Sequence, residues 1–278
     1  MNTNKSKITV RTVVSALILL VLDVGVFAQT EMERETQSTK PFRIGVGIGS
    51  SYGGYRDETD SEINRYYNNR LTYLINGNIE KRYLLHTFDI GFFMGENTVA
   101  SKFEDKYSPP RYFSYRANIK YALDHRLWGC NRFPGYLGGA FRTDFYFVTQ
   151  TLEIAKYAMI LSLGVHATQK WYMHRRHSLV ATAGLPLLGY AARSPYPGVD
   201  HIQEKHMVDG KPLKILTEGT FAGVHNYWAM FGDLKYHFQA TKWLSLHAGM
   251  GVELSRINVP LPRIDAMFRI NAGLSFTF

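Results

Sequence analysis

The chain has 278 residues, a formal net charge of +9, 45% hydrophobic residues, 14% aromatic residues and one cysteine. The plentiful aromatic and aliphatic side chains exclude an intrinsically disordered protein. The single Cys130 excludes a disulfide scaffold and a cysteine-based zinc module. No apolar run of about 18 residues follows the N-terminal segment, so a helical membrane protein is excluded as well.

The N-terminal segment has the pattern of a secretory signal peptide. A basic start precedes a largely apolar run over 13–22, and cleavage is predicted between Ala28 and Gln29. The apolar run is too short for a membrane anchor, because a spanning helix needs about 20 residues. Residues 1–28 carry three cations and one anion, so the predicted mature chain has a charge of +7. Residues 29–41 are predicted to form a periplasmic tail.

The rest of the sequence alternates between apolar and polar residues with the period of a β-strand. In the segment 42–48, every even position is apolar and every odd position is Gly or Arg. The alternation predicts ten strands, near 42–52, 70–80, 83–94, 111–123, 134–149, 155–170, 178–190, 220–238, 243–256 and 264–278.

The predicted strands are longer than those of ordinary soluble proteins. They run from about 10 to 19 residues, whereas soluble strands average about five or six and a tilted membrane strand needs about 9–11. One face of each strand is apolar and aromatic, and the other carries charges. This pattern fits a membrane barrel with lipid outside and a polar lumen, but a soluble sandwich produces the same alternation.

Three features favour the membrane barrel. The long predicted connections 53–69, 95–110 and 191–219 all fall on one side, which is typical of the extracellular side of such barrels. Aromatic residues gather at the other end of the strands, where rings favour the membrane interface. The turns on that other side have a net charge of +6, from Lys81, Arg82, Arg126, Arg132, Arg175, Arg176 and Lys242 against Asp124.

We therefore predict an all-β protein in which residues 42–278 form one transmembrane antiparallel up-and-down β-barrel of ten strands. A turn signal at Val208–Lys211 leaves twelve strands as an alternative, because the hairpin around it could also cross the membrane.

The end of the sequence resembles the carboxy-terminal strand of Gram-negative outer-membrane proteins. Ile270, Ala272, Leu274 and Phe276 alternate along one face, and the chain ends on Phe278. In that class the terminal aromatic strand is read by the barrel-insertion machinery, so the resemblance implies this partner, outer-membrane lipids as surroundings, and the cell outer membrane as location. Gln29 directly after the predicted cleavage point is similar to secreted proteins of Bacteroidetes.

A ten-stranded barrel is narrow, so large inward side chains would fill much of its lumen. The preferred interpretation of the inward charges is an ionic network that closes the lumen, and the alternative is a small pore with a basic constriction suited to anions. Gly45, Gly47 and Gly49 on the first strand are expected to leave some free volume. The predicted network comprises Asp89, Arg116, Lys120, Arg142, Asp144, Asp233, Lys235, His247, Glu253, Asp265 and Arg269.

One predicted cluster contains the residue types of a hydrolase. If the last hairpin but one folds about 239–241, Asp233 lies opposite His247 and Lys235 opposite Ser245. A serine, a histidine and a carboxylate within reach could supply a nucleophile, a base and an orienting group. A structural ion pair is the preferred interpretation, since the cluster lies far from the expected outer surface.

A second predicted cluster arises if the last hairpin folds about 257–261, which sets Glu253 near Asp265. Close carboxylates can share a proton or bind a metal. Arg263 and Arg269 nearby favour a neutralised network instead.

Known outer-membrane enzyme families do not match residue by residue. Outer-membrane phospholipases and lipid A deacylases place a histidine close to a serine in a strand, and Ser245 and His247 reverse that order. Omptin proteases use an Asp–His element at the extracellular rim, and the only Asp–His dipeptide here, Asp124–His125, falls on the opposite side. No catalytic residue, metal ligand or cofactor is predicted; the spacing of His201, His206 and His225 fits no known ligand pattern.

The expected function is therefore a structural, surface-contact or narrow-channel role, with an outer-membrane hydrolase as the alternative. The tyrosine-rich segment 52–70 is expected to lie in an outer loop, where a surface ligand would bind. A nucleic-acid partner is not expected, because the cations are spread over strand ends and the lumen.

Overall fold

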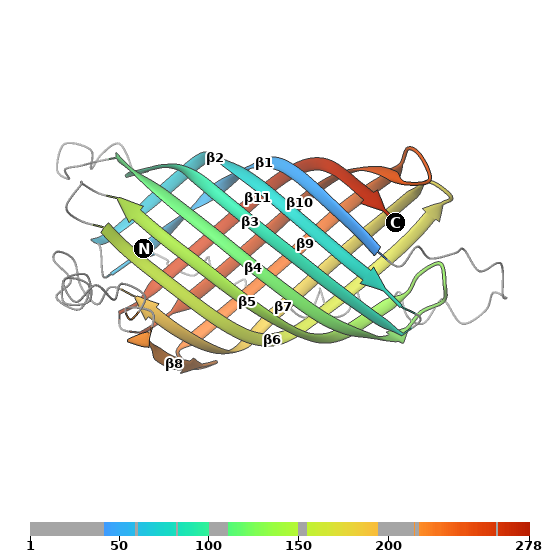
Figure 1. The fold of residues 1–278 in the computed structure, drawn as a ribbon. Helices are drawn as coiled ribbons and strands as arrows, with labels where there is room; N and C mark the ends of the chain where they lie inside the picture. Colours follow the sequence, from blue (N-terminus) through green and yellow to red (C-terminus); the bar gives the residue numbers. More distant parts are fainter. Residues whose placement is uncertain are drawn as a thin grey trace, which may run out of the picture.

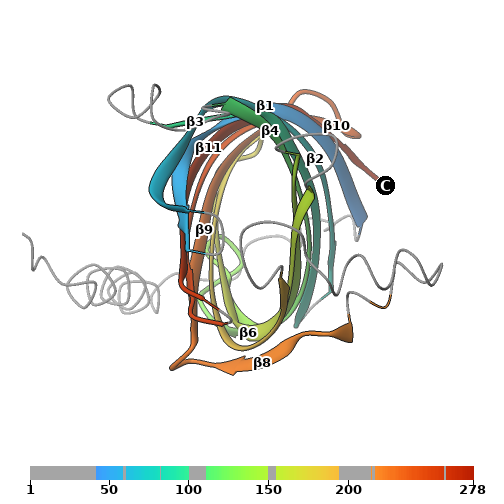
Figure 2. The same cartoon turned by 90° about the vertical axis from the view of Figure 1, so that its left-hand side faces the viewer.

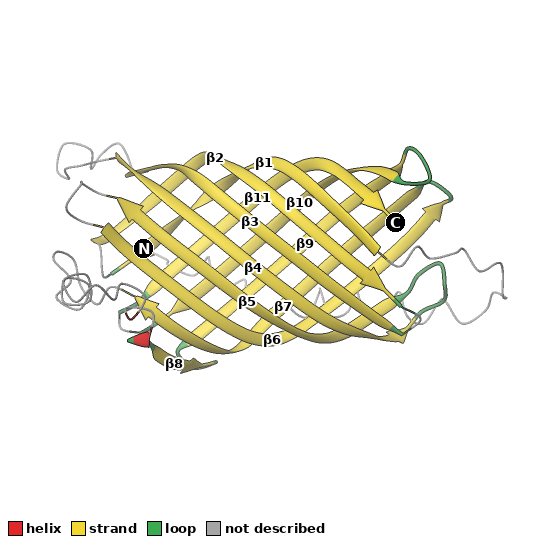
Figure 3. Cartoon of the chain, viewed as in Figure 1, coloured by secondary structure: helices red, strands yellow, loops and turns green. Residues whose placement is uncertain are grey.

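The protein is described from a computed structural model, which covers residues 42–58, 61–81, 83–99, 111–149, 155–193, 214, 217–259 and 261–278. Nearly all of these residues lie in strands that wind around a common axis (Figures 1 and 3). The strands are β1 (Phe42–Asp57), β2 (Ser61–Glu80), β3 (Leu84–Val99), β4 (Arg111–Trp128), β5 (Gly135–Thr149), β6 (Ala155–His174), β7 (His177–Arg193), β8 (Thr220–Gly223), β9 (Tyr227–Gln239), β10 (Leu244–Ile257) and β11 (Arg263–Thr277).

Ten of these strands close into a barrel. Each long strand pairs antiparallel with its neighbour in sequence, β9 follows β7 in the wall, and β1 pairs with β11 along its whole length. The β6–β7 pairing completes the ring, which Figure 2 shows end-on. The prediction of an all-β antiparallel ten-strand barrel is confirmed. The Val208–Lys211 turn signal behind the twelve-strand alternative lies outside the described residues.

The predicted strand over 220–238 is divided in two. β8 pairs with Leu188–Ala191 of β7, while β9 pairs with His177–Gly184 of the same strand. A turn separates them, in which the Asn226 backbone N–H donates to the Gly223 carbonyl at 2.9 Å. Glycine and asparagine favour such turns. β8 consequently lies outside the ring of ten strands (Figure 2).

The predicted long connection 53–69 is wrong. β1 continues to Asp57 and β2 begins at Ser61, so most of this segment is strand. On β1 the alternation simply continues, because Ser51, Tyr55 and Asp57 are all buried at odd-numbered positions. On β2 a register irregularity between Arg70 and Tyr67, both of which are buried, moves the inward positions from even to odd numbers, and this change of phase hides the continuation in the sequence.

Apolar side chains cover the outside of the barrel and polar ones fill its inside. Ile48 is 63% exposed and Met250 is 50% exposed, whereas Arg116 is 8% exposed and Glu253 is 6% exposed. A soluble protein buries these two kinds of side chain in the opposite way. The apolar outer face is therefore the face that a membrane barrel presents to lipid.

The two ends of the barrel differ. The end that carries Phe42, Phe278 and the turns after β2, β4, β6 and β9 is called the turn end, and the opposite end is called the loop end. Aromatic rings stack at the turn end, with 5.9 Å between the ring centroids of Phe42 and Phe278 and 6.1 Å for Trp243 and Phe276. Such rings suit a membrane interface.

The predicted signal peptide, its cleavage point and the tail 29–41 lie outside the described residues. Among the residues that are described, no helix has the length and apolar character needed to cross a bilayer.

Candidate functional site in the barrel lumen

The structure brings ten of the eleven predicted lumen residues into one connected set of ion pairs, called here the ionic layer. Its residues come from β3, β4 and β5 in one arc of the wall and from β9, β10 and β11 in the opposite arc, and their inward positions face one another across the narrow axis. The set is electrically balanced. It contains the five cations Arg116, Lys120, Arg142, Lys235 and Arg269 and the five carboxylates Asp89, Asp144, Asp233, Glu253 and Asp265.

The centre of the ionic layer is a four-membered ring of two arginines and two carboxylates. Arg142 contacts Asp144 at 2.7 Å and Glu253 at 2.6 Å. Arg116 contacts the same two carboxylates at 3.0 and 2.8 Å. Arg116 and Arg142 lie on neighbouring strands and Glu253 lies on β10, so these contacts cross the lumen. The centre of the barrel is therefore bridged by charge-assisted hydrogen bonds.

Two branches extend the ring: Arg116 reaches Asp265 at 3.7 Å, and Arg269 leads to Asp233, which Lys120 joins to Asp89. Arg269 bridges Glu253 at 3.2 Å and Asp233 at 2.5 Å. Asp89 accepts from Lys120 at 2.9 Å and from Lys235 at 3.2 Å. Every carboxylate of the branches therefore has at least one cation beside it, as buried charges require.

Sequence reasoning missed part of the network near the loop end. Arg263 contacts Asp265 at 3.1 Å and Asp57 at 3.3 Å, and Asp57 contacts Arg193 at 2.7 Å. Asp57 and Arg193 fall within the predicted connections 53–69 and 191–219. They belong to strands that run further than predicted, so the continued alternation was the signal that could have found them.

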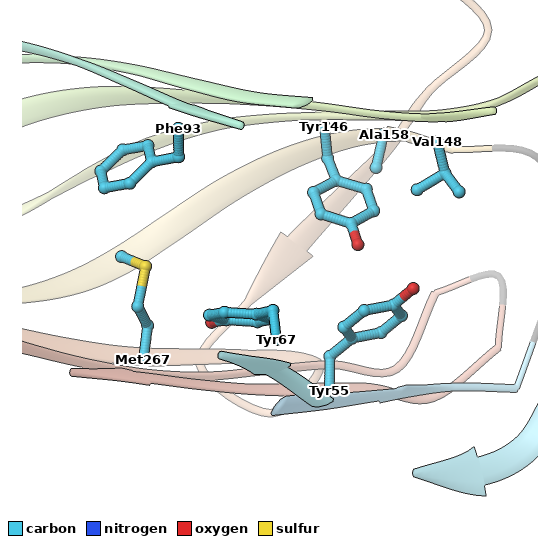
Figure 4. Packing of buried hydrophobic residues seen from close by; sticks show 7 residues of the cluster. All are labelled: Tyr55, Tyr67, Phe93, Tyr146, Val148, Ala158 and Met267. Atoms are coloured by element: carbon cyan, nitrogen blue, oxygen red, sulfur yellow. The ribbon is translucent and has the colours of Figure 1, made fainter. Parts of the chain in front are cut away.

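An aromatic layer fills the lumen next to the ionic layer on the loop-end side. Side chains from opposite walls point toward one another there (Figure 4). The rings of Tyr55 and Tyr146 meet edge to face with 5.6 Å between centroids, and the Arg263 guanidinium lies 4.0 Å from the Tyr146 centroid. The layer comprises Tyr55, Tyr67, Phe93, Tyr146, Val148, Ala158 and Met267.

Little space remains within these two layers. The cavities enclosed among the side chains of the ionic layer have volumes of about 20 and 40 Å³, which is room for about one to three water molecules. The free volume expected beside the glycines of β1 is reduced as well. A Cβ at Gly47 would come within 3.2 Å of the His247 imidazole, which shows that a side chain from β10 occupies the space at that position.

The predicted Ser–His–carboxylate cluster does not form. The hairpin turns about 241–243, so Asp233 lies opposite Gly251, Lys235 opposite Gly249, and His247 opposite His237. The prediction failed because the turn was centred two residues too early, which shifts the pairing by four. His247 Nδ1 lies 3.0 Å from the Ser275 hydroxyl, and this histidine is the predicted lumen residue that has no ion pair in the described structure.

The second predicted carboxylate pair is also displaced, since Asp265 lies opposite Ser255 and Glu253 opposite Met267. The two carboxylates are connected only through Arg116, which is 2.8 Å from Glu253 and 3.7 Å from Asp265. They form part of a neutralised network.

Asp124 belongs to a buried pair that the sequence did not suggest. Its carboxylate lies 2.7 Å from His166 Nδ1 and accepts from the Thr168 hydroxyl at 3.0 Å. Asp124 has no exposed surface and His166 is 1% exposed, so a substrate has no access to them. His125 faces outward and stacks with Tyr83. Of the three histidines considered as metal ligands, His225 lies exposed between β8 and β9, and the other two lie outside the described residues.

No protein-family model and no curated protein matches this sequence. Among solved structures, the chain is similar to the outer membrane protease OmpT from Escherichia coli, with a TM-score of 0.57 and 8% identity over 88% of this chain and 99% of that chain. It is also similar to the autotransporter NalP translocator domain from Neisseria meningitidis, with a TM-score of 0.38 and 8% identity over 96% of each chain. This chain therefore has the fold of a Gram-negative outer-membrane β-barrel, and that fold with its apolar outer face indicates the cell outer membrane as its location.

Proposed function

We propose that the protein is a non-conducting outer-membrane barrel that holds its loop end at the cell surface in a structural or surface-contact role. The observation that carries this proposal is the blocked middle of the lumen: the ionic layer and the aromatic layer lie next to each other across the axis, and the cavities enclosed among their side chains have volumes of about 20 and 40 Å³. A solute would have to break charge-assisted contacts such as Arg142–Glu253 to pass. A small-solute channel is the weaker of the roles expected from the sequence.

In this proposal the turn end faces the periplasm and outer-membrane lipids surround the apolar wall. Insertion would use the barrel-insertion machinery, which would read β11 and the terminal Phe278. The support is the alternating apolar edge of β11 and the stacking of Phe278 on Phe42 at the turn end. The predicted signal peptide fits export, and Gln29 supports an origin in Bacteroidetes.

The hydrolase alternative has less support. OmpT is named a protease, but in the described part of this chain Asp233 lies across from Gly251, away from His247. The buried Asp124–His166 pair has no route to a substrate. No described observation favours hydrolysis.

Conductance in planar bilayers tests the closed lumen. We expect wild-type protein that has been refolded and inserted to show no discrete current steps, because two side-chain layers block the axis. The matched opened variant removes a charge pair and two rings at once, by Arg142→Ala, Glu253→Ala, Tyr67→Ala and Tyr146→Ala, so it stays electrically balanced. This variant should conduct, and its current steps serve as the positive control that inserted barrels are detected in the assay. Stable steps from the wild type would overturn the proposal.

A further inference from the structure

The lumen is not filled along its whole length. On the turn-end side of the ionic layer it widens into a cavity of about 1330 Å³, called here the vestibule, and residues from both the wall and the turns line it. Asp89 and Lys235 of the ionic layer form part of its lining. Such a volume exceeds the range of about 300–1,000 Å³ that is common for small-molecule sites.

The vestibule lining is strongly cationic. Its two carboxylates are already paired, Glu80 with Lys170 at 2.6 Å and Asp89 with Lys235 at 3.2 Å. Nine cations against two carboxylates leave an excess of seven positive charges. The nine are Arg43, Lys81, Arg126, Arg132, Lys170, Arg175, Arg176, Lys235 and Lys242.

Two of these cations are held in place by neutral groups. Arg126 donates to the Asn131 side-chain oxygen at 3.1 Å and to the Gly129 carbonyl at 3.2 Å. Arg132 donates to the carbonyls of Tyr172 and Met173, both at 3.2 Å. These bonds fix the guanidinium groups without neutralising them, so their charge remains available to an anion in the vestibule.

The inner wall of the vestibule also contains buried polar atoms without a partner in the described structure. His237 Nδ1 and Thr277 Oγ1 make no hydrogen bond, and the two residues are only 7% and 6% exposed. The Thr182 hydroxyl, further along the same lining, is also without a partner. Buried polar groups are nearly always hydrogen-bonded, but these three atoms have almost no accessible surface and similar atoms, such as Asp124 Oδ1, occur elsewhere in the barrel, so it is the charge excess that points to a ligand.

We propose that the vestibule binds a soluble anion that carries several phosphate groups. Crowded positive charges repel one another, and a ligand of opposite charge relieves this repulsion. Each phosphate group brings up to about two negative charges and three acceptor oxygens, and guanidinium groups match its geometry. A lipid is the poorer occupant, because polar side chains such as Asn76, Asn78 and Ser178 line the space that its acyl chains would need.

Calorimetric titration of the refolded full-length protein with sodium tripolyphosphate tests the site. We expect saturable binding with one ligand per barrel, which weakens as sodium chloride is added because salt screens the charges. Arg126→Gln should weaken binding about tenfold, and so should Arg175→Gln combined with Arg176→Gln, since hydrogen bonds to a charged group have roughly this effect.

The matched control removes two positive charges at the loop end, by Arg56→Gln and Arg256→Gln. Both side chains are exposed and far from the vestibule, so this variant should bind as the wild type does. Absence of saturable binding, or an equal loss in the control, would overturn the proposal. The proposal would also be overturned if the site bound a lipid instead. In that case phosphatidylglycerol in mixed vesicles would bind with the same dependence on the arginines, and tripolyphosphate would not compete with it.

Discussion

Replacing Arg142 with Met is expected to lower the free energy of unfolding of the barrel by roughly 3–5 kcal/mol, because it removes one partner from a buried ion network. Arg142 contacts Asp144 at 2.7 Å and Glu253 at 2.6 Å, and its own side chain is 8% exposed. Methionine keeps much of the volume of the stem and removes the charge. The ionic layer is then left with four cations and five carboxylates in a space that water scarcely enters.

A double variant tests whether charge balance, and not lost packing, causes this destabilisation. Arg142→Met with Glu253→Gln returns the ionic layer to four cations and four carboxylates, and we expect it to be more stable than the sum of the single changes predicts. Urea titration in lipid vesicles, followed by tryptophan fluorescence, measures each free energy. Arg56→Met is the control, because its ion pair with Glu58 is largely exposed and such pairs contribute about 0–1 kcal/mol. If Arg142→Met costs no more than this control, the network does not stabilise the barrel.

The ionic layer raises the question of why the lumen is not filled with apolar side chains, since buried ion pairs often stabilise no better than well-packed hydrophobic residues. An apolar lumen would give every strand two apolar faces. A strand that slips by one residue exchanges its faces, and only a difference between them penalises that slip. Charges such as Lys120 and Asp233 inside, opposed to Ile48 and Met250 outside, therefore specify which face meets lipid.

This period of two explains what the sequence could predict. It identified the inward face of six strands that carry charges, β3, β4, β5, β9, β10 and β11, so ten of the eleven proposed lumen residues lie in the ionic layer. It also predicted the ten strands of the wall. It missed the division between β8 and β9. The apolar outward positions are odd-numbered at Phe221 and even-numbered at Met230, and this change of phase was a signal of the intervening turn.

Register was not predictable in the same way. If the centre of a turn moves along the chain by two residues, every side chain stays on the same face of the sheet. Each residue nevertheless pairs with a residue four positions further along the neighbouring strand. Asp233 thus lies beside Gly251 and not His247. Contacts across the lumen, such as Arg116 with Glu253, join strands that are not neighbours in the wall. They follow from ring closure and side-chain length, which strand patterns do not encode.

The assignment of the outer face to lipid predicts a second large effect. Ile48→Lys is expected to lower the free energy of unfolding in lipid vesicles by roughly 2–4 kcal/mol, because a cation at the bilayer midplane is costly. Ile48 is 63% exposed and lies six residues from the start of β1. At about 3.3 Å per residue and a tilt of about 40°, this is about 15 Å from the turn end, which is close to half the thickness of a bilayer core.

Depth provides the matched control. Leu127→Lys places the same charge on an equally exposed side chain, 57% exposed, one residue before the end of β4 at the turn end. It should cost no more than about 1 kcal/mol because the charge reaches the interface. Ile48→Ala separates the loss of packing from the cost of the charge. In a barrel surrounded by water, a lysine in place of an exposed isoleucine would be tolerated at either depth, so equal and small effects of Ile48→Lys and Leu127→Lys would exclude a lipid-facing wall.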